Sequence, residues 1–219
     1  MTYDSGLRHR RKIMLTNERN AMASTPRTGD IHRKTRETDI TLALALDGRG
    51  EASIKTGVPF LDHMLTLLAV HGYFNLTITA AGDTEIDAHH TVEDVGICLG
   101  QALKKALGDF AGITRYGCAS VPMDEALARV TLDCSNRPHL HYGVMVPDQK
   151  VGEFDTALAK EFLRAFALHG GITLHIELLH GENTHHILEA IFKALGRALD
   201  QATSTNPRAA GPLSSKGSL

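Results

Sequence analysis

The sequence reads His89-His90-Thr91-Val92-Glu93 and, 96 residues later, His185-His186-Ile187-Leu188-Glu189. Each copy of this His-His-x-x-Glu pattern begins a predicted helix and follows a residue that can cap it, Asp87 or Asn183. Imidazole nitrogens and a carboxylate within one helical turn suit a divalent transition metal. The repetition predicts a duplicated fold, and a metal site that neither half builds alone.

The likeness between the halves extends beyond this motif. When the two His-Gly pairs, His71-Gly72 and His169-Gly170, are aligned, His63 stands opposite Glu161. The apolar residues of the two motif helices then match at helical spacing and predict one buried stripe on each helix. These stripes comprise Val92, Val95, Leu99, Leu103 and Ala106, and Leu188, Ile191, Leu195, Ala198 and Leu199. A duplicated unit is therefore expected, with halves at residues 31–118 and 119–219, the second ending in a C-terminal tail.

Each half is expected to contain strands and two helices. The order strand, strand, helix, strand, helix predicts an α+β fold, an antiparallel or mixed sheet covered by helices. Apolar residues at every second position indicate the strands, and apolar residues at helical spacing indicate the first helix of each half. The strands are expected at residues 40–46, 76–80, 127–131, 139–145 and 172–176, and these helices at residues 60–70 and up to 168.

Composition excludes several classes of protein. The net charge of −2 gives no basic field for nucleic acid, and no segment reaches the ~18 apolar residues of a membrane span. We therefore expect neither nucleic acid nor membrane as a partner. The three cysteines, Cys98, Cys118 and Cys134, show no Cys-x-x-Cys spacing, which favours buried thiols in a reducing cytoplasm and predicts a cytoplasmic protein.

The first thirty residues are polar and carry a basic cluster, Arg8-His9-Arg10-Arg11-Lys12. We expect residues 1–30 to form a disordered extension outside the fold. A transit peptide and a basic interaction arm are the alternatives, and Met22 offers a shorter start.

The spacing within the motif predicts two metal positions. Adjacent histidines on a helix diverge by ~100° because one turn takes ~3.6 residues, so one ion does not readily bind both. Each position is expected to draw one histidine from each pair, with His63 and Glu161 completing the shells. Nitrogen and carboxylate ligands without thiolate favour Mn²⁺, Fe²⁺, Co²⁺ or Zn²⁺ over Ca²⁺. The alternative is that the paired histidines only cap their helices or face solvent.

Several longer motifs resemble the imidazoleglycerol-phosphate dehydratase family, from about Arg33 to Leu219. They are Arg36-Glu37-Thr38, Gly57-Val58-Pro59-Phe60-Leu61-Asp62-His63-Met64, Asp87-Ala88 with the first His-His-x-x-Glu and Asp94, Gly181-Glu182-Asn183-Thr184 with the second and Ala190, and Ser214-Ser215-Lys216-Gly217. The resemblance implies manganese-dependent dehydration of imidazole glycerol phosphate to imidazole acetol phosphate in histidine biosynthesis. It further implies two repeats like the second domain of ribosomal protein S5, two Mn²⁺ per site, and trimers assembled into a homo-oligomer of 24 subunits with sites between them.

Carried over residue by residue, the resemblance also implies a set of metal ligands. Glu161 departs from the family pattern, in which many members have His; it is either a ligand with altered metal preference or a helix-surface residue. The residues that match the family's ligands are His63, His89, His90, Glu93, His185, His186 and Glu189.

The same resemblance implies residues for catalysis and for binding the substrate. Glu37 matches an acidic substrate-site residue and is expected to act as acid–base, and His71 matches a position lining the pocket. The tail has Leu213 where the family commonly places Pro before the serine pair, which changes the expected path of the tail. Substrate contacts are expected from Glu37, His63, His71, His89 and His185, and phosphate contacts from Arg115, Arg137, Lys193, Ser214, Ser215 and Lys216.

Three other functions fit parts of the sequence. A two-metal hydrolase would use the same ligand types, and a metal-binding oligomer would bind Mn²⁺ without turnover. An RNA-binding module is suggested only by the S5-like fold, and the near-neutral charge opposes it. No Asp-x-Asp motif precedes the fold, so a fused phosphatase domain is not expected.

Overall fold

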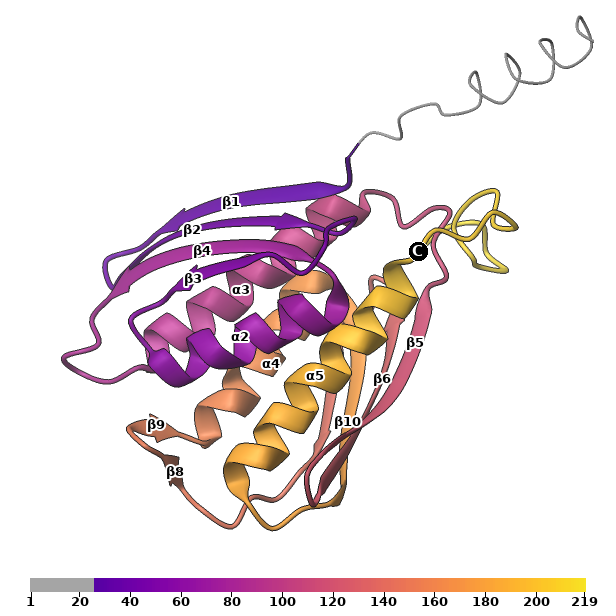
Figure 1. The fold of residues 1–219 in the computed structure, drawn as a ribbon. Helices are drawn as coiled ribbons and strands as arrows, with labels where there is room; N and C mark the ends of the chain where they lie inside the picture. Colours follow the sequence, from indigo (N-terminus) through magenta and orange to yellow (C-terminus); the bar gives the residue numbers. More distant parts are fainter. Residues whose placement is uncertain (1–25) are drawn as a thin grey trace, which may run out of the picture.

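The computed structural model of this chain describes residues 26–219 (Figure 1). The expected extension, with its basic cluster and Met22, therefore lies almost entirely outside the described residues. Its boundary was placed too late, because the first strand, β1, already begins at Thr28. The strand start was missed because β1 is a polar edge strand, largely exposed, and it lacks the apolar alternation that marks half-buried strands.

The first half forms a four-stranded sheet in the order β1-β2-β4-β3. Strands β3 and β4 are parallel and are joined through helix α2, whereas the other neighbours are antiparallel. Helix α3 follows β4 and begins at the first histidine pair. The elements are β1 (Thr28–Lys34), β2 (Thr38–Ala45), β3 (Ala52–Lys55), α2 (Pro59–Gly72), β4 (Asn75–Gly82) and α3 (His89–Leu107).

The second half repeats this arrangement, with the sheet order β5-β6-β10-β7 and parallel pairing of β7 with β10. A small hairpin of β8 and β9 is inserted between β7 and α4. The predicted α+β duplication is thereby confirmed. The elements are β5 (Tyr116–Met123), β6 (Ala126–Cys134), β7 (His139–Gly143), β8 (Lys150–Val151), β9 (Phe154–Asp155), α4 (Ala157–Gly170), β10 (Ile172–His180) and α5 (Thr184–Thr203).

The predicted order within each half was incomplete, because each sheet has four strands. Of the strands absent from the prediction, β1, β3 and β5 lie at the edges of these sheets, and the two-residue strands β8 and β9 form a separate hairpin. These three edge strands bury at most one residue each, so their sequences carry a weak alternation signal. The predicted strands and helices all occur, displaced by a few residues at their ends.

Within residues 26–219 the four helices lie between the two four-stranded sheets, and one continuous apolar core joins the halves (Figure 1). Both predicted stripes are buried, from Val92 to Ala106 on α3 and from Leu188 to Leu199 on α5. Among the described residues no helix combines the length and apolar character that a membrane span requires.

The helices pair across the halves, because α2 packs against α5 and α3 packs against α4. Glycines at equivalent positions allow the close approach. A Cβ atom on Gly100 would lie 2.6 Å from the carbonyl oxygen of Phe166, and one on Gly196 would lie 2.5 Å from that of Leu68. The preceding helix of one half is therefore placed beside the motif helix of the other.

Candidate metal centre and active site

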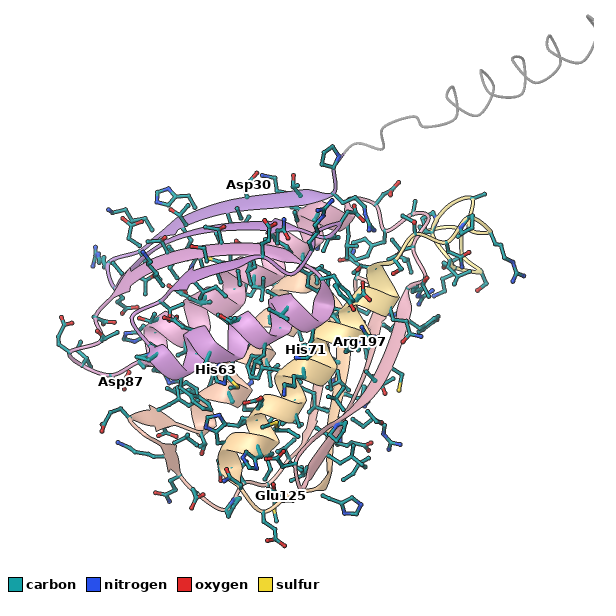
Figure 2. The ribbon with its side chains drawn as sticks, in the orientation of Figure 1. Asp30, His63, His71, Asp87, Glu125 and Arg197 are labelled. Atoms are coloured by element: carbon teal, nitrogen blue, oxygen red, sulfur yellow. The ribbon has the colours of Figure 1, made fainter. Side chains whose placement is uncertain are left out.

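Helices α2 and α5 bring three metal-ligand side chains together, which we call the α2–α5 cluster: His63, His185 and Glu189. One potential donor atom from each lies within 4.8 Å of the other two. Nε2 of His63 lies 3.2 Å, and Nε2 of His185 lies 3.3 Å, from the same oxygen, Oε2 of Glu189. Figure 2 places His63 on the side of α2 that faces α5. Two imidazoles that converge on one carboxylate are a donor set that fits Mn²⁺ or a similar ion.

The start of α5 orients this cluster. The Asn183 side chain accepts hydrogen bonds from the backbone nitrogens of His185 and His186, at 2.9 and 3.3 Å, as the capping prediction required. The ring of Phe60 meets the ring of His185 edge-on, with centroids 5.2 Å apart. Capping and ring packing together restrict the direction in which the His185 imidazole points.

Glu189 is the most buried member of the cluster, with 9% of its side chain exposed. Burial alone would raise the pKa of this carboxyl, but the hydrogen bonds from Lys193 and His63 outweigh it and lower the pKa below its ordinary value. Nζ of Lys193 lies 2.7 Å from Oε1, the oxygen that does not face the histidines. Glu189 is therefore held as an anion, the form that binds a cation.

The equivalent side chains on α3 and α4 form a looser set, the α3–α4 cluster: His89, Glu93 and Glu161. Nε2 of His89 lies 3.9 Å from Oε2 of Glu93. Glu161 instead pairs with Arg164 on its own helix, at 3.0 Å. Glu161 and His89 nevertheless line one cavity of about 1020 Å³, together with His63. The cluster has the matching residue types, with Glu161 turned toward an arginine.

The second histidine of each motif faces away from its own cluster. Nδ1 of His186 lies 2.7 Å from Oε2 of Glu125, and Nδ1 of His90 lies 2.9 Å from Oδ2 of Asp83. These hydrogen bonds raise the pKa of both histidines, and the bond to His186 lowers the pKa of Glu125 to about 2. The divergence of adjacent histidines expected from the helical turn is thus present in both motifs.

Within the described residues of one chain the two histidine pairs do not meet, and the expectation that each metal position draws one histidine from each pair stays a prediction. Among residues 26–219 the α2–α5 cluster is the only group of three or more potential ligands whose donor atoms lie close enough together to bind one ion. Figure 2 shows Asp87, near the start of α3, and Glu125, near the start of α5, well apart. The physical reason is the helix pairing, since α3 and α5 each pack mainly against a different partner.

Glu37 and His71 lie in different settings. Glu37 is exposed before β2, and its Oε1 lies 3.9 Å from Nε2 of His90. His71 is in the last turn of α2, where burial, followed by the charges of Lys193 and Arg197, lowers its pKa. A neutral imidazole beside two cations can accept a hydrogen bond at neutral pH. In one chain the two residues are therefore apart: Glu37 lies beside the histidine pair of α3, and His71 lies between α2 and α5.

The tail forms a second cavity, of about 800 Å³, at the far end of α5. Arg115 is buried there and has a structural role, because its guanidinium donates hydrogen bonds to both carboxylate oxygens of Asp133 and to the carbonyl of Leu213. Arg137 is exposed, and its Nη2 lies 3.7 Å from Asp133. The lining brings together most of the predicted phosphate residues, Arg115, Arg137, Ser214, Ser215 and Lys216, and adds Arg208.

Lys193 lies apart from this tail cavity, beside Glu189. The predicted metal ligands His185, His186 and Glu189 lie near the start of α5, and the tail follows its end (Figure 1). The 20 residues of α5 span ~30 Å at ~1.5 Å per residue. The predicted metal ligands and the predicted phosphate cavity of one chain are therefore separated by most of a helix.

Two carboxylates in these surroundings were missing from the sequence prediction, Asp83 and Glu125. Glu125 could have been found from the duplication, because it precedes β6 as Glu37 precedes β2. No sequence pattern pointed to Asp83, because it lies in the loop between β4 and α3. Its role depends on the contact that the folded loop makes with His90.

Comparison with known proteins points to one family. The family model described as imidazoleglycerol-phosphate dehydratase matches residues 56–199. An imidazoleglycerol-phosphate dehydratase of Syntrophobacter fumaroxidans is 62% identical over 193 residues, covering 88% of this chain and 98% of its own. That of Halalkalibacterium halodurans is 59% identical over 193 residues, covering 88% and 100%.

Solved structures agree. The crystal structure of the Staphylococcus aureus imidazoleglycerol-phosphate dehydratase is similar with a TM-score of 0.75 and 42% identity, covering 82% of this chain and 99% of its own. The Pyrococcus furiosus enzyme gives a TM-score of 0.76 and 42% identity, covering 86% and 100%. With its duplicated fold, its two His-His-x-x-Glu helices and these relatives, the chain belongs to the imidazoleglycerol-phosphate dehydratase family, hydro-lyases of histidine biosynthesis.

Proposed function

We propose that this hydro-lyase is manganese-dependent and removes water from imidazole glycerol phosphate to give imidazole acetol phosphate, with two Mn²⁺ per site. The observation that carries the metal requirement is the α2–α5 cluster, in which the Nε2 atoms of His63 and His185 converge on one oxygen of the anionic Glu189. Nitrogen and carboxylate donors without thiolate fit Mn²⁺, Fe²⁺, Co²⁺ or Zn²⁺, and the family resemblance favours Mn²⁺ among these.

When bound, such a metal supplies Lewis-acid stabilisation of negative charge on the imidazole ring of the substrate and orients that ring. The chain's own groups perform the remaining tasks. Glu37 is assigned the proton transfer, because it is exposed beside His90 and no hydrogen bond to its carboxylate is found within residues 26–219. His71, held neutral by its surroundings, is assigned to the pocket wall as a hydrogen-bonding group.

The phosphate is assigned to the tail cavity. Arg137, Ser214, Ser215 and Lys216 can donate hydrogen bonds there, while Arg115 fixes the tail through its bond to the Leu213 carbonyl. Arginine gives phosphate a bidentate fork, and lysine adds a positive charge.

We further propose that each complete site combines residues of different subunits in a trimer-based homo-oligomer of 24 chains. Two features support shared sites. The tail cavity and the α2–α5 cluster lie near opposite ends of α5, too far apart for one small phosphate ester. His90 and His186 point away from the clusters of their own chain and are free to meet those of a neighbour.

The test is turnover of imidazole glycerol phosphate by full-length protein, stripped of metal with a chelator and then resupplied with Mn²⁺. Formation of imidazole acetol phosphate only after resupply is the expected result. Full turnover by protein shown to be free of metal would remove the metal from the proposal. Release of inorganic phosphate in place of the keto product would indicate a two-metal hydrolase instead.

A further inference from the structure

The second histidine of each motif is held by a carboxylate in the same way. Oε2 of Glu125 accepts from Nδ1 of His186, and Oδ2 of Asp83 accepts from Nδ1 of His90. A histidine that donates through Nδ1 has its lone pair on Nε2, the atom that is then available to a metal. Within residues 26–219 neither Nε2 makes a hydrogen bond; the nearest carboxylate oxygens, on Asp124 and Glu37, lie 3.8 and 3.9 Å away.

The two carboxylates come from different parts of the duplicated unit. Glu125 stands in the two-residue turn between β5 and β6, where Asp124 has a left-handed backbone, φ 47°. Its counterpart before β2 is Glu37, which does not bond Nδ1 of His90. In the first half Asp83, directly after β4, bonds that atom instead, whereas Gly181 follows β10 in the second half. The same hydrogen-bond geometry is thus made twice from positions that the duplication does not relate.

Because Asp83, and not Glu37, bonds Nδ1 of His90, Glu37 and Glu125 have different roles. Both oxygens of Glu125 are occupied, because Oε1 accepts from the backbone nitrogens of Glu182 and Asn183 and Oε2 accepts from His186. The Glu37 carboxylate accepts no hydrogen bond within residues 26–219, and the side chain is exposed. With Asp83 holding His90, the first half keeps a free carboxylate beside Nε2.

We propose that Glu125 and Asp83 are positioning residues that fix the tautomer and direction of His186 and His90, so that each presents a bare Nε2 as a metal ligand. The inference rests on the proposed metal-dependent function and deepens it. Neither carboxylate touches the ion or the substrate. Each acts through its histidine, as outer partners of metal-bound histidines do.

The hydrogen-bond partners predict that Glu125→Gln reverses the tautomer. The amide oxygen must face the backbone nitrogens of Glu182 and Asn183, which are donors, so the amide nitrogen faces His186 and donates to Nδ1. The proton of the imidazole then moves to Nε2, which can no longer bind a metal. The side chain keeps its volume and its bond to the loop before α5.

Asp83→Asn is predicted to behave differently. Oδ1 of Asp83 is buried without a hydrogen-bond partner, so the amide nitrogen can take that place while the amide oxygen still accepts from Nδ1 of His90. The tautomer is retained and only the charge is lost. Asp83→Ala removes the acceptor altogether.

The experiment measures Mn²⁺ binding to full-length metal-stripped protein by equilibrium dialysis and metal analysis. Glu125→Gln should weaken about half of the bound Mn²⁺ by roughly 10- to 100-fold. Asp83→Ala should weaken the other half by a similar factor, and Asp83→Asn should change affinity less than Asp83→Ala. The matched controls are Glu85→Gln, an exposed carboxylate in the loop of Asp83, and Glu182→Gln, an exposed carboxylate in the loop before α5 that Glu125 contacts; both should bind as the unaltered protein does.

Thermal unfolding without metal distinguishes positioning from simple stabilisation. Positioning predicts that Glu125→Gln keeps the unfolding temperature of the metal-free protein while losing affinity. Unaltered affinity in both Glu125→Gln and Asp83→Ala, with normal binding by the parent, overturns the positioning inference alone. A parent protein that binds no Mn²⁺ overturns the proposed metal dependence together with it.

Discussion

Nε2 of His63 lies 3.2 Å from Oε2 of Glu189, although 126 residues separate the two side chains in the sequence. The contact exists because α2 of the first half packs against α5 of the second. His185, four residues before Glu189, reaches the same oxygen from within the helix. A local i, i+4 pair and a distant histidine thus make one cluster from both halves.

Glu189→Gln should abolish the compact cluster as a cation site. The amide keeps the shape but loses the charge that the histidines and Lys193 surround. Loss of an outer partner of a ligand costs about 10- to 100-fold in metal affinity, so loss of this ligand should exceed ~100-fold. Mn²⁺ titration measures it. Lys104→Met, a distant exposed lysine variant, should bind normally; equal affinity in both variants would exclude Glu189 as a ligand.

Glu161→Ala tests whether the departure from the family pattern still binds metal. If Glu161 turns from Arg164 toward His89, the variant should bind about half the Mn²⁺ of the parent, and Glu161→His should restore it. Arg164→Ala is the control, since it frees Glu161 without removing a ligand. Full metal content in Glu161→Ala would make this residue a helix-surface carboxylate.

Glu37→Gln should lower kcat about 10²- to 10⁴-fold, the range for loss of a general acid or base. Metal content should stay intact, because Glu37 lies 3.9 Å from His90 and outside both clusters. Steady-state kinetics and metal analysis on the same preparation give both quantities. Unchanged turnover with intact metal would remove Glu37 from the proton transfer.

Lys216→Ala should raise KM for the phosphate substrate by about 10-fold or more, since a charge-assisted hydrogen bond contributes about 1.5–3 kcal/mol. Mn²⁺ affinity should be unchanged, because the tail cavity lies at the far end of α5 from the α2–α5 cluster. Lys104→Ala, at the exposed end of α3, serves as the charge control. An unaltered KM would place the phosphate elsewhere.

The buried thiols should make the fold less stable in alkali. Burial raises the pKa of Cys98 to about 11 and that of Cys134 to about 12, above the usual value of a thiol. The unfolded chain therefore releases these protons first, so the free energy of unfolding is unaffected below about pH 8.5 and falls as pH rises toward 11. Each thiol contributes at most about 1.4 kcal/mol per pH unit.

Urea unfolding between pH 8 and 10, followed by circular dichroism, measures this slope. Cys134→Ala should reduce the loss of stability with pH even if it lowers stability at pH 8. A slope equal to that of the parent would mean that Cys134 ionises in the folded chain as readily as in the unfolded one.

Much of the fold could be predicted from the local spacing of apolar residues in the sequence. Apolar alternation identified β2, β4, β6 and β10, and helical spacing identified the stripes of α3 and α5, because each of these elements buries one face. The alternation also identified β7, an edge strand whose Leu140 and Tyr142 are partly buried against the core. The edge strands β1, β3 and β5 bury few residues, and their sequences show no clear apolar alternation. The divergence of His185 and His186 followed from helix geometry alone.

From residue type and short spacing alone one can predict the duplication, the capped His-His-x-x-Glu helices and the ligand chemistry. The tertiary structure adds which helices pair, and therefore that His63 meets Glu189 and that the histidine pairs stay apart within one chain. It also decided that Glu125 and Asp83 hold His186 and His90. Such contacts are made across the core and between loops, where packing of distant segments sets the distances and no local periodicity records them.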